Sequence, residues 1–217
     1  MPMLGAGMQR VGVYIDGFNL YFGLKARQWK RYYWLNVVRL AENLLRPNQC
    51  LGFVKYFTAR ISGPPEKRMR QEQYLDALAT LQNLKILYGH YMPTPSTCRH
   101  CGVSDSVPKE KMTDVNIAVE ILVDAYQNAF DLALIISGDG DLVPPVRAIR
   151  RLFPAKVVVV AFPPRRASVQ LGTSAHAHFM IGRAVIAKSL LPEGVAAPGG
   201  FVLKCPPEWV PISESRA

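Results

Sequence analysis

Two stretches of the sequence end an apolar run in side chains that could bind a metal ion. Residues 132–141 read Leu-Ala-Leu-Ile-Ile-Ser-Gly-Asp-Gly-Asp, so Asp139 and Asp141 follow the run and a glycine separates them. Residues 11–19 read Val-Gly-Val-Tyr-Ile-Asp-Gly-Phe-Asn and place Asp16 and Asn19 in the same way. Carboxylate oxygens are the ligands that hard cations such as Mg²⁺ and Mn²⁺ prefer. We therefore expect one shared acidic pocket that holds a divalent cation.

The charge balance indicates which substrate such a pocket would serve. The chain has 26 Lys and Arg residues against 16 Asp and Glu residues, a net charge of +10. An excess of this kind favours polyanionic partners, nucleic acid first. A cation held by carboxylates activates water and neutralises the charge that builds on a phosphate. The combination predicts hydrolysis of phosphodiester bonds.

The elements that must position these acids alternate between strand and helix. The apolar patterns predict strands over residues 11–15, 51–61, 84–91, 132–137 and 156–162, and helices over 18–25, 35–45, 66–82, 113–129 and 142–152. We expect residues 92–109 to be a loop. The alternation predicts an α/β fold with a parallel sheet, whose strand ends share one edge. If strands 11–15 and 132–137 are neighbours, Asp16 and Asp139 meet at a topological switch point.

The helix predicted over residues 113–129 supplies a third acid. At about 100° per residue, Asp114 lies at the margin of the apolar face that contains Ile121. The same projection extends the apolar face over Val115, Val119, Leu122 and Tyr126 and turns Glu120 and Asp124 toward solvent. Thr113 is expected to cap the helix. Asp114 is then either a site residue or a partner of the helix's first backbone amides.

Each polar residue also has a purely structural interpretation. Asp16 could form an Asx-turn, Asn19 could cap a helix, and Asp139 could be a turn residue. Asp141 is equally well placed to cap the helix that starts at Leu142 and to bind metal. The coincidence of all four on one edge of one sheet favours a site.

Three motifs in this order resemble those of the NYN domain family, a branch of the PIN-like nucleases. They are Tyr14-Ile-Asp-Gly-Phe-Asn19, Glu110-Lys-Met-Thr-Asp-Val-Asn-Ile-Ala118 and Ser137-Gly-Asp-Gly-Asp-Leu-Val-Pro144. The resemblance runs from about residue 11 to 190. It implies a PIN-like three-layer α/β/α sandwich with a central, mostly parallel sheet. It also implies a Mg²⁺- or Mn²⁺-dependent ribonuclease.

The resemblance assigns roles residue by residue. Asp16, Asp114 and Asp139 would be metal ligands, Asn19 would orient a ligand or a substrate phosphate, and Asp141 would complete the catalytic acidic cluster. Ser137 would hold a carboxylate or a water at the substrate. Lys111 stands where the family often has a substrate-binding lysine. Met112-Thr113 replaces a pair that commonly contains glycine.

Basic and aromatic residues indicate how RNA would be held. Arg165 and Arg166 follow the strand 156–162 at the edge of the acids and are candidates for the phosphate path. Residues 25–34 mix lysine and arginine with Trp29, Tyr32, Tyr33 and Trp34, which suits single-stranded RNA because bases stack on rings. The alternative is that some of these rings belong to the core.

A pair of cysteines gives a weaker signal. Cys98-Arg-His-Cys101 is half of a zinc site, which normally needs four ligands. The alternative is a reduced pair in a loop. We expect a cytoplasmic protein, because no signal peptide precedes the cysteines. No apolar run has the length of a membrane helix, so we expect no membrane partner. The sequence is compatible with a monomer or a homo-oligomer.

We expect one NYN/PIN-like nuclease domain over residues 10–191 and a proline-rich tail over 192–217. Two other functions remain open at this point. The first is a non-catalytic module of the same fold that binds RNA or protein. The second is a phosphatase for small phosphates, which the basic excess disfavours because a small substrate needs no extended cationic surface.

Overall fold

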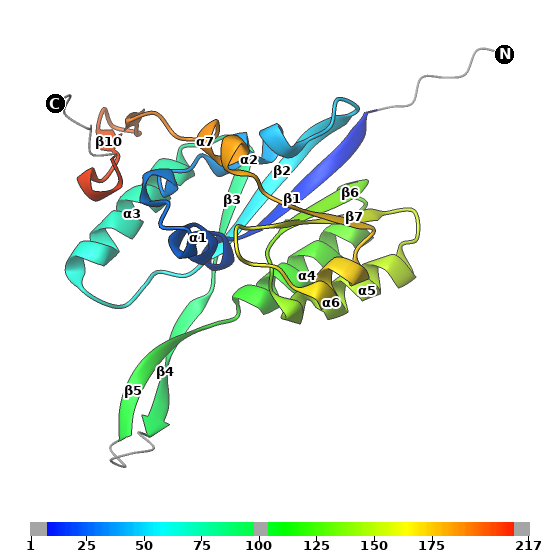
Figure 1. The fold of residues 1–217 in the computed structure, drawn as a ribbon, viewed down its shortest axis with the longest axis horizontal. Helices are drawn as coiled ribbons and strands as arrows, with labels where there is room; N and C mark the ends of the chain where they lie inside the picture. Colours follow the sequence, from blue (N-terminus) through cyan, green and yellow to red (C-terminus); the bar gives the residue numbers. More distant parts are fainter. Residues whose placement is uncertain (1–7, 98–103, 211–217) are drawn as a thin grey trace.

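The computed structural model describes residues 8–97 and 104–210, with the backbone alone over 90–97 and 104–111. Its centre is a six-stranded sheet in which every neighbouring pair is parallel (Figure 1). Across the sheet the strands are β3 (Leu84–Tyr88), β2 (Gln49–Thr58), β1 (Gln9–Asp16), β6 (Leu132–Ile136), β7 (Val157–Phe162) and β8 (Ala177–Met180). The chain order reverses between β1 and β6, so the expected neighbours do pair. Their carboxyl ends form the switch point.

Helices cover both faces of the sheet and make the three-layer sandwich that the sequence predicts. One face packs against α1 (Gly17–Ala26), α2 (Val37–Leu44), α3 (Pro65–Ala79) and α7 (Arg183–Ala187). The other face packs against α4 (Thr113–Tyr126), α5 (Val143–Leu152) and α6 (Val169–Ser174). Alternation along β1 sends Val13 and Ile15 into the first core and Tyr14 into the second. No helix in the described part of the chain has the length and apolar character needed to cross a bilayer.

The expected loop over residues 92–109 is a β-hairpin instead. Strand β4 (His90–Thr97) pairs with β5 (Ser104–Lys111) in antiparallel register, with Pro93 opposite Pro108. Proline cannot donate to a ladder, but both strands of a two-stranded ribbon are edges and tolerate it. The prolines therefore hide the strand pattern in the sequence. The hairpin projects from the body and leads directly into α4 (Figure 1).

Helix α4 presents a different face to the sheet from the one expected. Val115, Val119 and Tyr126 are exposed, by 59%, 52% and 82%, whereas Asp124 is buried. Lys55 on β2 explains the rotation, because its Nζ lies 2.6 Å from carboxylate oxygens of both Asp124 and Glu120. A hydrophobicity projection cannot anticipate a cation from another element. Burial raises the pKa of Glu120, but the hydrogen bond and charge of Lys55 outweigh it, and the net pKa is lowered.

The folded chain continues beyond residue 191, where a tail was expected. Strands β9 (Gly194–Ala196) and β10 (Val202–Lys204) pair, and a 3₁₀ turn, η3 (Pro207–Trp209), follows. Glu208 pairs with Arg70 on α3 at 2.6 Å. The Trp209 ring packs on Tyr74 with the centroids 6.2 Å apart. Residues 192–210 therefore belong to the folded body, and 211–217 lie outside the described residues.

Candidate active site

A pocket of about 170 Å³ opens at the carboxyl ends of β1 and β6. Three of the expected acids line it together, one from each of the three sequence motifs. The lining residues are Asp16, Phe18, Asn19, Phe22, Thr113, Asp114, Asp139 and Arg166. The site thus forms where the strand order reverses, as is general for open α/β sheets.

Asp16 ends β1 and starts α1 at the same time. Its Oδ1 accepts the backbone N–H of Asn19 at 2.9 Å, which caps the helix. Its Oδ2 accepts the hydroxyl of Ser137 at 2.9 Å, so the carboxylate is held from both strands. Only 4% of Asp16 is exposed. The structural interpretation of Asp16 is therefore confirmed, and the cap also fixes the carboxylate that lines the pocket.

Hydrogen bonds from uncharged donors hold the residues after β6 close to the end of β1. Gly138 donates its N–H to Oδ1 of Asn19 at 3.0 Å, and Asp139 donates its N–H to the Ser137 hydroxyl at 3.1 Å. Asp139 then accepts the N–H of Asp141 at 3.0 Å and caps the 3₁₀ turn η2 (Gly140–Leu142). The last two contacts reduce the freedom of Asp139 at the pocket wall.

Asp114 reaches the pocket from the first turn of α4, directly after the hairpin. Met112, not Thr113, is the cap residue, and it adopts a left-handed backbone with φ of 78° and no side-chain cap bond. Glycine fits that conformation best, which agrees with the glycine-containing pair that this chain replaces. Thr113 is instead the first helical residue, 3% exposed, and lines the pocket beside Asp114.

Arg166 supplies a cation to the pocket from the turn after β7. A Cβ on Gly138 would lie 2.4 Å from the Arg166 carbonyl oxygen, so glycine is required for the two backbones to meet. Arg165 takes a left-handed backbone with φ of 56°, and its exposed side chain is not among those that line the pocket. Of the two arginines that were candidates for the phosphate path, only Arg166 lines the pocket with the carboxylates.

The remaining candidates occupy other positions. Ser137 is fully buried, so it acts on Asp16 rather than on a bound strand. Asp141 is exposed and does not line the pocket. It lies within η2, which Asp139 caps, and α5 has Leu142 as its cap residue, with no side-chain cap bond. Lys111 ends β5, and its side chain is outside the description, as are Cys98 and Cys101 altogether.

Three lining residues were not anticipated from the sequence: Phe18, Phe22 and Thr113. The two phenylalanines lie one helical turn apart on α1 and stack with ring centroids 6.4 Å apart. The signal available was their spacing directly after Asp16, since residues four apart share a helix face. Phe22 is 40% exposed.

A buried tyrosine lies close to Asp16 at the end of β1. Burial raises the pKa of Tyr56 above the ordinary value of tyrosine, and the nearby charge of Asp16 raises it further. The side chain of Tyr56 lies against Gly17, where an added Cβ would come within 2.6 Å of the phenol oxygen. A phenol in contact with the strand end thus stays protonated beside the acid.

The donor set fits a hard divalent cation that arrives with its own ligands. Among residues 8–89 and 112–210, whose side chains the structure describes, no group of three or more His, Cys, Asp or Glu forms a ready-made metal site. The carboxylates of Asp16, Asp114 and Asp139 nevertheless line one pocket. Mg²⁺ usually keeps several waters and binds through one or two carboxylates plus a substrate phosphate. The pocket suits that mode of binding better than a dedicated protein cage.

Comparison with known proteins places the chain in a family. The chain is 26% identical over 188 residues to 6-hydroxy-3-succinoylpyridine 3-monooxygenase HspA of Pseudomonas putida, and the match covers 70% of this chain and 59% of that relative. A crystal structure of a protein of unknown function from Vibrio parahaemolyticus shares the fold, with a TM-score of 0.55 and 20% identity. That match covers 87% of this chain and 100% of the other. The NYN domain model matches residues 10–181, which include all the residues that line the pocket. The chain therefore belongs to the NYN domain family, whose members are nuclease-like.

Proposed function

We propose that this protein is a metal-dependent ribonuclease that hydrolyses RNA phosphodiester bonds at the acidic pocket. The observation that carries the proposal is the convergence of Asp16, Asp114 and Asp139 on one pocket at the switch point, with Arg166 on its wall. The net charge of +10 supports a polyanionic substrate.

The three carboxylates would hold Mg²⁺ or Mn²⁺. A cation at such a site lowers the pKa of water and offsets the charge that develops on a phosphate. Asp16 and Asp139 contribute oxygens whose directions are fixed by Ser137 and by backbone N–H groups. Such preorganisation matters because a site that is already aligned spends no energy on reorganisation during the reaction.

Arg166 would bind the RNA, and Asn19 would keep the two strand ends of the site together. The guanidinium of Arg166 offers planar donors that suit two phosphate oxygens at once. The amide of Asn19 holds Gly138 through its Oδ1. It thereby keeps the end of β6 beside the end of β1, and so keeps Asp139 near Asp16.

The test is cleavage of a labelled single-stranded RNA in Mg²⁺, Mn²⁺ or EDTA by the wild type and by Asp139→Asn. We expect metal-dependent cleavage that falls about 100-fold or more in the variant, since lost metal binding removes several kcal/mol of stabilisation. Asp76→Asn is the matched control, because Asp76 is an exposed acid on α3. Its cleavage rate should equal that of the wild type.

The same assay separates the other functions. RNA binding without cleavage by either protein would favour a non-catalytic module of this fold. Turnover of mononucleotides without turnover of oligomers would favour a phosphatase. Equal cleavage by wild type and Asp139→Asn would refute the proposed mechanism.

A second candidate function follows from the curated relative, whose name describes a monooxygenase acting on a substituted pyridine. The observation that favours it is the pair of rings, Phe18 and Phe22, beside Arg166 in the pocket, which suits an aromatic anion. The chain spans 59% of that relative's length. Consumption of 6-hydroxy-3-succinoylpyridine by the purified protein, supplied with O₂ and a two-electron reductant such as a reduced nicotinamide, tests it, with Arg166→Gln expected to weaken substrate binding.

A further inference from the structure

Phe22 is an exposed ring with two cations close to it at the rim of the acidic pocket. Its side chain lines the pocket and is 40% exposed. The Nζ of Lys25 lies 5.7 Å from the ring centroid, and the guanidinium carbon of Arg166 lies 5.6 Å from it. Exposed rings flanked by cations are the elements with which proteins hold unpaired bases and their phosphates.

A second group of cations continues from this rim across the molecule. Arg27, at the end of α1, lies over the ring of Trp29 at 5.9 Å. Arg183, at the start of α7, lies over the same ring at 5.6 Å. Its Nε also donates to the hydroxyl of Tyr32 at 3.1 Å. Lys25, Arg27, Arg166 and Arg183 are all exposed. Two of them lie at Phe22 and two at Trp29, and α1 with its C-cap residue Arg27 carries Phe22, Lys25 and Arg27 in sequence.

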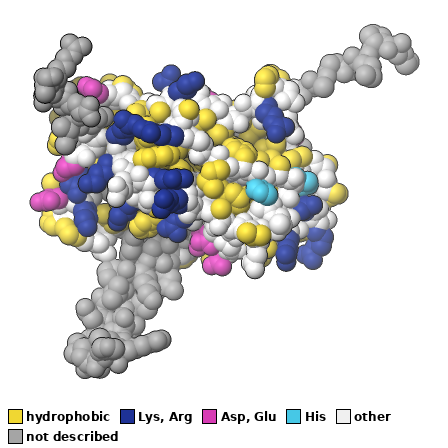
Figure 2. Space-filling model, in the orientation of Figure 1, with side chains coloured by type: hydrophobic (Ala, Val, Ile, Leu, Met, Phe, Trp, Pro, Cys, Tyr) yellow, Lys and Arg dark blue, Asp and Glu magenta, His cyan; other side chains and the backbone are white. Residues whose placement is uncertain are grey.

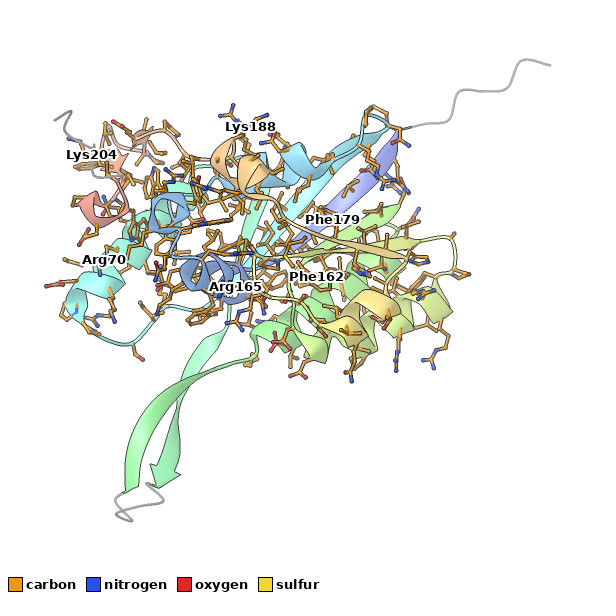
Figure 3. The ribbon with its side chains drawn as sticks, in the orientation of Figure 1. Arg70, Phe162, Arg165, Phe179, Lys188 and Lys204 are labelled. Atoms are coloured by element: carbon orange, nitrogen blue, oxygen red, sulfur yellow. The ribbon has the colours of Figure 1, made fainter. Side chains whose placement is uncertain are left out.

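The segments that build this face carry no acid to offset the cations. No Asp or Glu occurs between Asp16 and Glu42, or between Asp141 and Glu193. Figure 2 shows lysine and arginine side chains gathered on this face, interleaved with apolar side chains, and a small acidic group below them. Arg165 and Lys188 mark the lower and upper parts of the same face in Figure 3. This pattern complements a single polyanionic strand.

The structure also separates rings that are available from rings that are not. Tyr32 and Trp34 are 5% and 2% exposed, so they belong to the core. Trp29 is partly buried and carries Arg27 and Arg183. Phe22 and its neighbour Tyr21, 38% exposed, are the rings of this region that a base can reach.

We infer that this face is a track for single-stranded RNA in which Phe22 stacks on the base next to the phosphate held at the acidic pocket. Lys25, Arg27 and Arg183 then contact phosphates further along the strand. The inference rests on the proposed function for the position of that phosphate, whereas binding along the track requires no cleavage. Stacking on a ring accepts every base, so the track predicts little sequence preference.

Close packing fixes the ring relative to the pocket. A Cβ on Gly23 would come within 2.8 Å of the Pro164 carbonyl oxygen, so α1 lies directly against the turn that carries Arg166. Phe22 precedes this contact and is stacked against Phe18. The platform is therefore formed before RNA binds, which lowers the entropy cost of binding.

The experiment measures binding without cleavage. Asp139→Asn protein in EDTA is titrated with short single-stranded RNAs that carry 2-aminopurine at successive positions, and both anisotropy and 2-aminopurine fluorescence are recorded. We expect the 2-aminopurine fluorescence to be quenched by stacking on binding. Adding Phe22→Leu should abolish that quenching and weaken binding about tenfold, given about 1–3 kcal/mol per stacked base. Phe22→Trp should restore both.

Phe179→Leu is the matched control, because Phe179 lies on β8, is 37% exposed and does not line the acidic pocket. It should bind as the parent protein does. Lys25→Gln and Arg27→Gln should each reduce the slope of log K against log salt by about 0.7. Single-stranded DNA and duplex RNA of the same length serve as competitors, and both should bind more weakly.

Two results would overturn the track. One is unchanged affinity and quenching in Phe22→Leu, and the other is tighter binding of duplex RNA than of single strands. Neither result depends on turnover, so failure of the track and failure of the proposed nuclease are separate outcomes. Stacking by a protein that never cleaves RNA would support the track and contradict the proposed nuclease function.

Discussion

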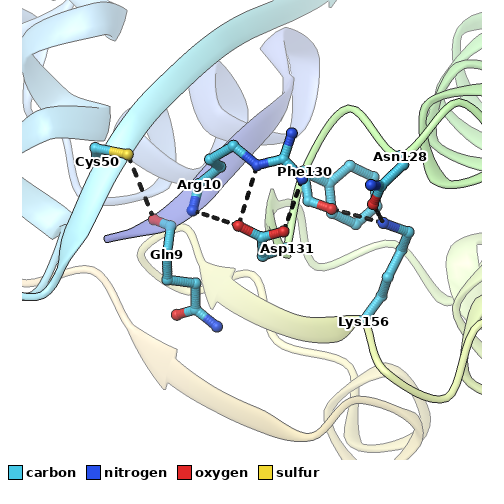
Figure 4. A network of polar contacts seen from close by, with 7 residues as sticks. All are labelled: Gln9, Arg10, Cys50, Asn128, Phe130, Asp131 and Lys156. Atoms are coloured by element: carbon cyan, nitrogen blue, oxygen red, sulfur yellow. Dashed lines mark hydrogen bonds and ion pairs between the residues drawn. The ribbon is translucent and has the colours of Figure 1, made fainter. Parts of the chain in front are cut away.

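At the amino edge of the central sheet a carboxylate is neutralised by the protein, whereas at the carboxyl edge two carboxylates are held by neutral donors. Asp131 accepts the backbone N–H of Arg10 at 2.8 Å and its Nη2 at 2.8 Å (Figure 4). Arg10 lowers the pKa of Asp131, mainly through these hydrogen bonds. At the other edge, Asp16 and Asp139 accept from a serine hydroxyl and from backbone N–H groups.

The difference shows what each edge is built to do. Lys156 at the amino edge is also satisfied internally, by Oδ1 of Asn128 at 2.8 Å and the carbonyl of Phe130 at 2.7 Å (Figure 4). Those contacts satisfy the charged groups within the protein and stabilise the fold. At the carboxyl edge a serine hydroxyl and backbone N–H groups fix the direction of two carboxylates that line one pocket, and a cation site needs carboxylates directed in this way. The same sheet thus separates stability from proposed chemistry.

Substitution of Asp16 should give the largest difference in cleavage between the two edges. Asp16→Asn keeps an oxygen for the Asn19 N–H and an amide group that can donate to Ser137, so the fold should persist. We expect RNA cleavage to fall about 100-fold or more, because a metal ligand worth several kcal/mol is lost. The measurement is the initial rate of metal-dependent cleavage, with thermal unfolding as the check on folding. Asp131→Asn at the amino edge should cleave at the wild-type rate, and equal losses in both variants would contradict the division of roles.

Gly138→Ala tests whether the two backbones at the carboxyl edge must meet. The added Cβ would lie 2.4 Å from the Arg166 carbonyl oxygen and would push the turn away from the pocket. A displacement of about 1 Å can cost up to 100-fold in rate, so we expect cleavage to fall about 10- to 100-fold. Gly52→Ala is the control, because its Cβ would meet only ordinary contacts, the nearest at 3.4 Å. A wild-type rate in Gly138→Ala would show that the position of Arg166 is unimportant.

Ser137→Ala tests how much the hydroxyl that donates to Asp16 contributes to stability and to cleavage. The hydroxyl is fully buried, donates to Asp16 and accepts from Asp139. Its loss should lower the free energy of unfolding by about 1–3 kcal/mol, since buried partners lose a hydrogen bond. Urea unfolding gives this value, and cleavage should fall at the same time. Ser137→Thr retains the hydroxyl and should recover part of the rate, and stability unaffected by Ser137→Ala would argue against a held carboxylate.

Arg10→Gln should have the smallest effect and should act on stability alone. The pKa of Asp131 is lowered from 3.8 in the folded protein, so the pair stabilises the fold above that pH and loses its effect as the pH falls below it. We expect a small decrease of the urea midpoint at pH 7 that diminishes as the pH falls from 3.8 through the lower pKa of Asp131 in the folded state. Cleavage at pH 7 should be unchanged. A difference in stability that grows toward acid would reverse the assigned sign.

The positions of the two strand-end acids could be predicted from the sequence because they depend on local patterns. Asp16 and Asp139 each follow a short apolar run, and the parallel arrangement of such runs brings their ends to one edge. Asp114 was placed by its position at the start of a helix and by the resemblance to the NYN motifs. These inferences need no knowledge of packing, and the pocket unites all three residues.

Other features depend on contacts between distant elements and escape a sequence reading. Lys55 on β2 buries Asp124, which a helical projection turns toward solvent. A left-handed turn at Arg165 decides which of two adjacent arginines reaches the pocket. The exposure of Phe22 follows from how α1 meets the turn after β7. Each of these is a tertiary result, since nothing in the local sequence specifies the partner.

The pairing of β1 with β6 also sets the order of events during synthesis. Val11 lies opposite Leu132 in the sheet, and the pocket further requires Arg166. Pairing of strands so distant in sequence is slow, because a long loop must close first. A growing chain emerges from the ribosome from its amino terminus, so Asp16 is available long before its partners. A nuclease built in this way would remain inactive toward its own message until translation of the domain is nearly complete.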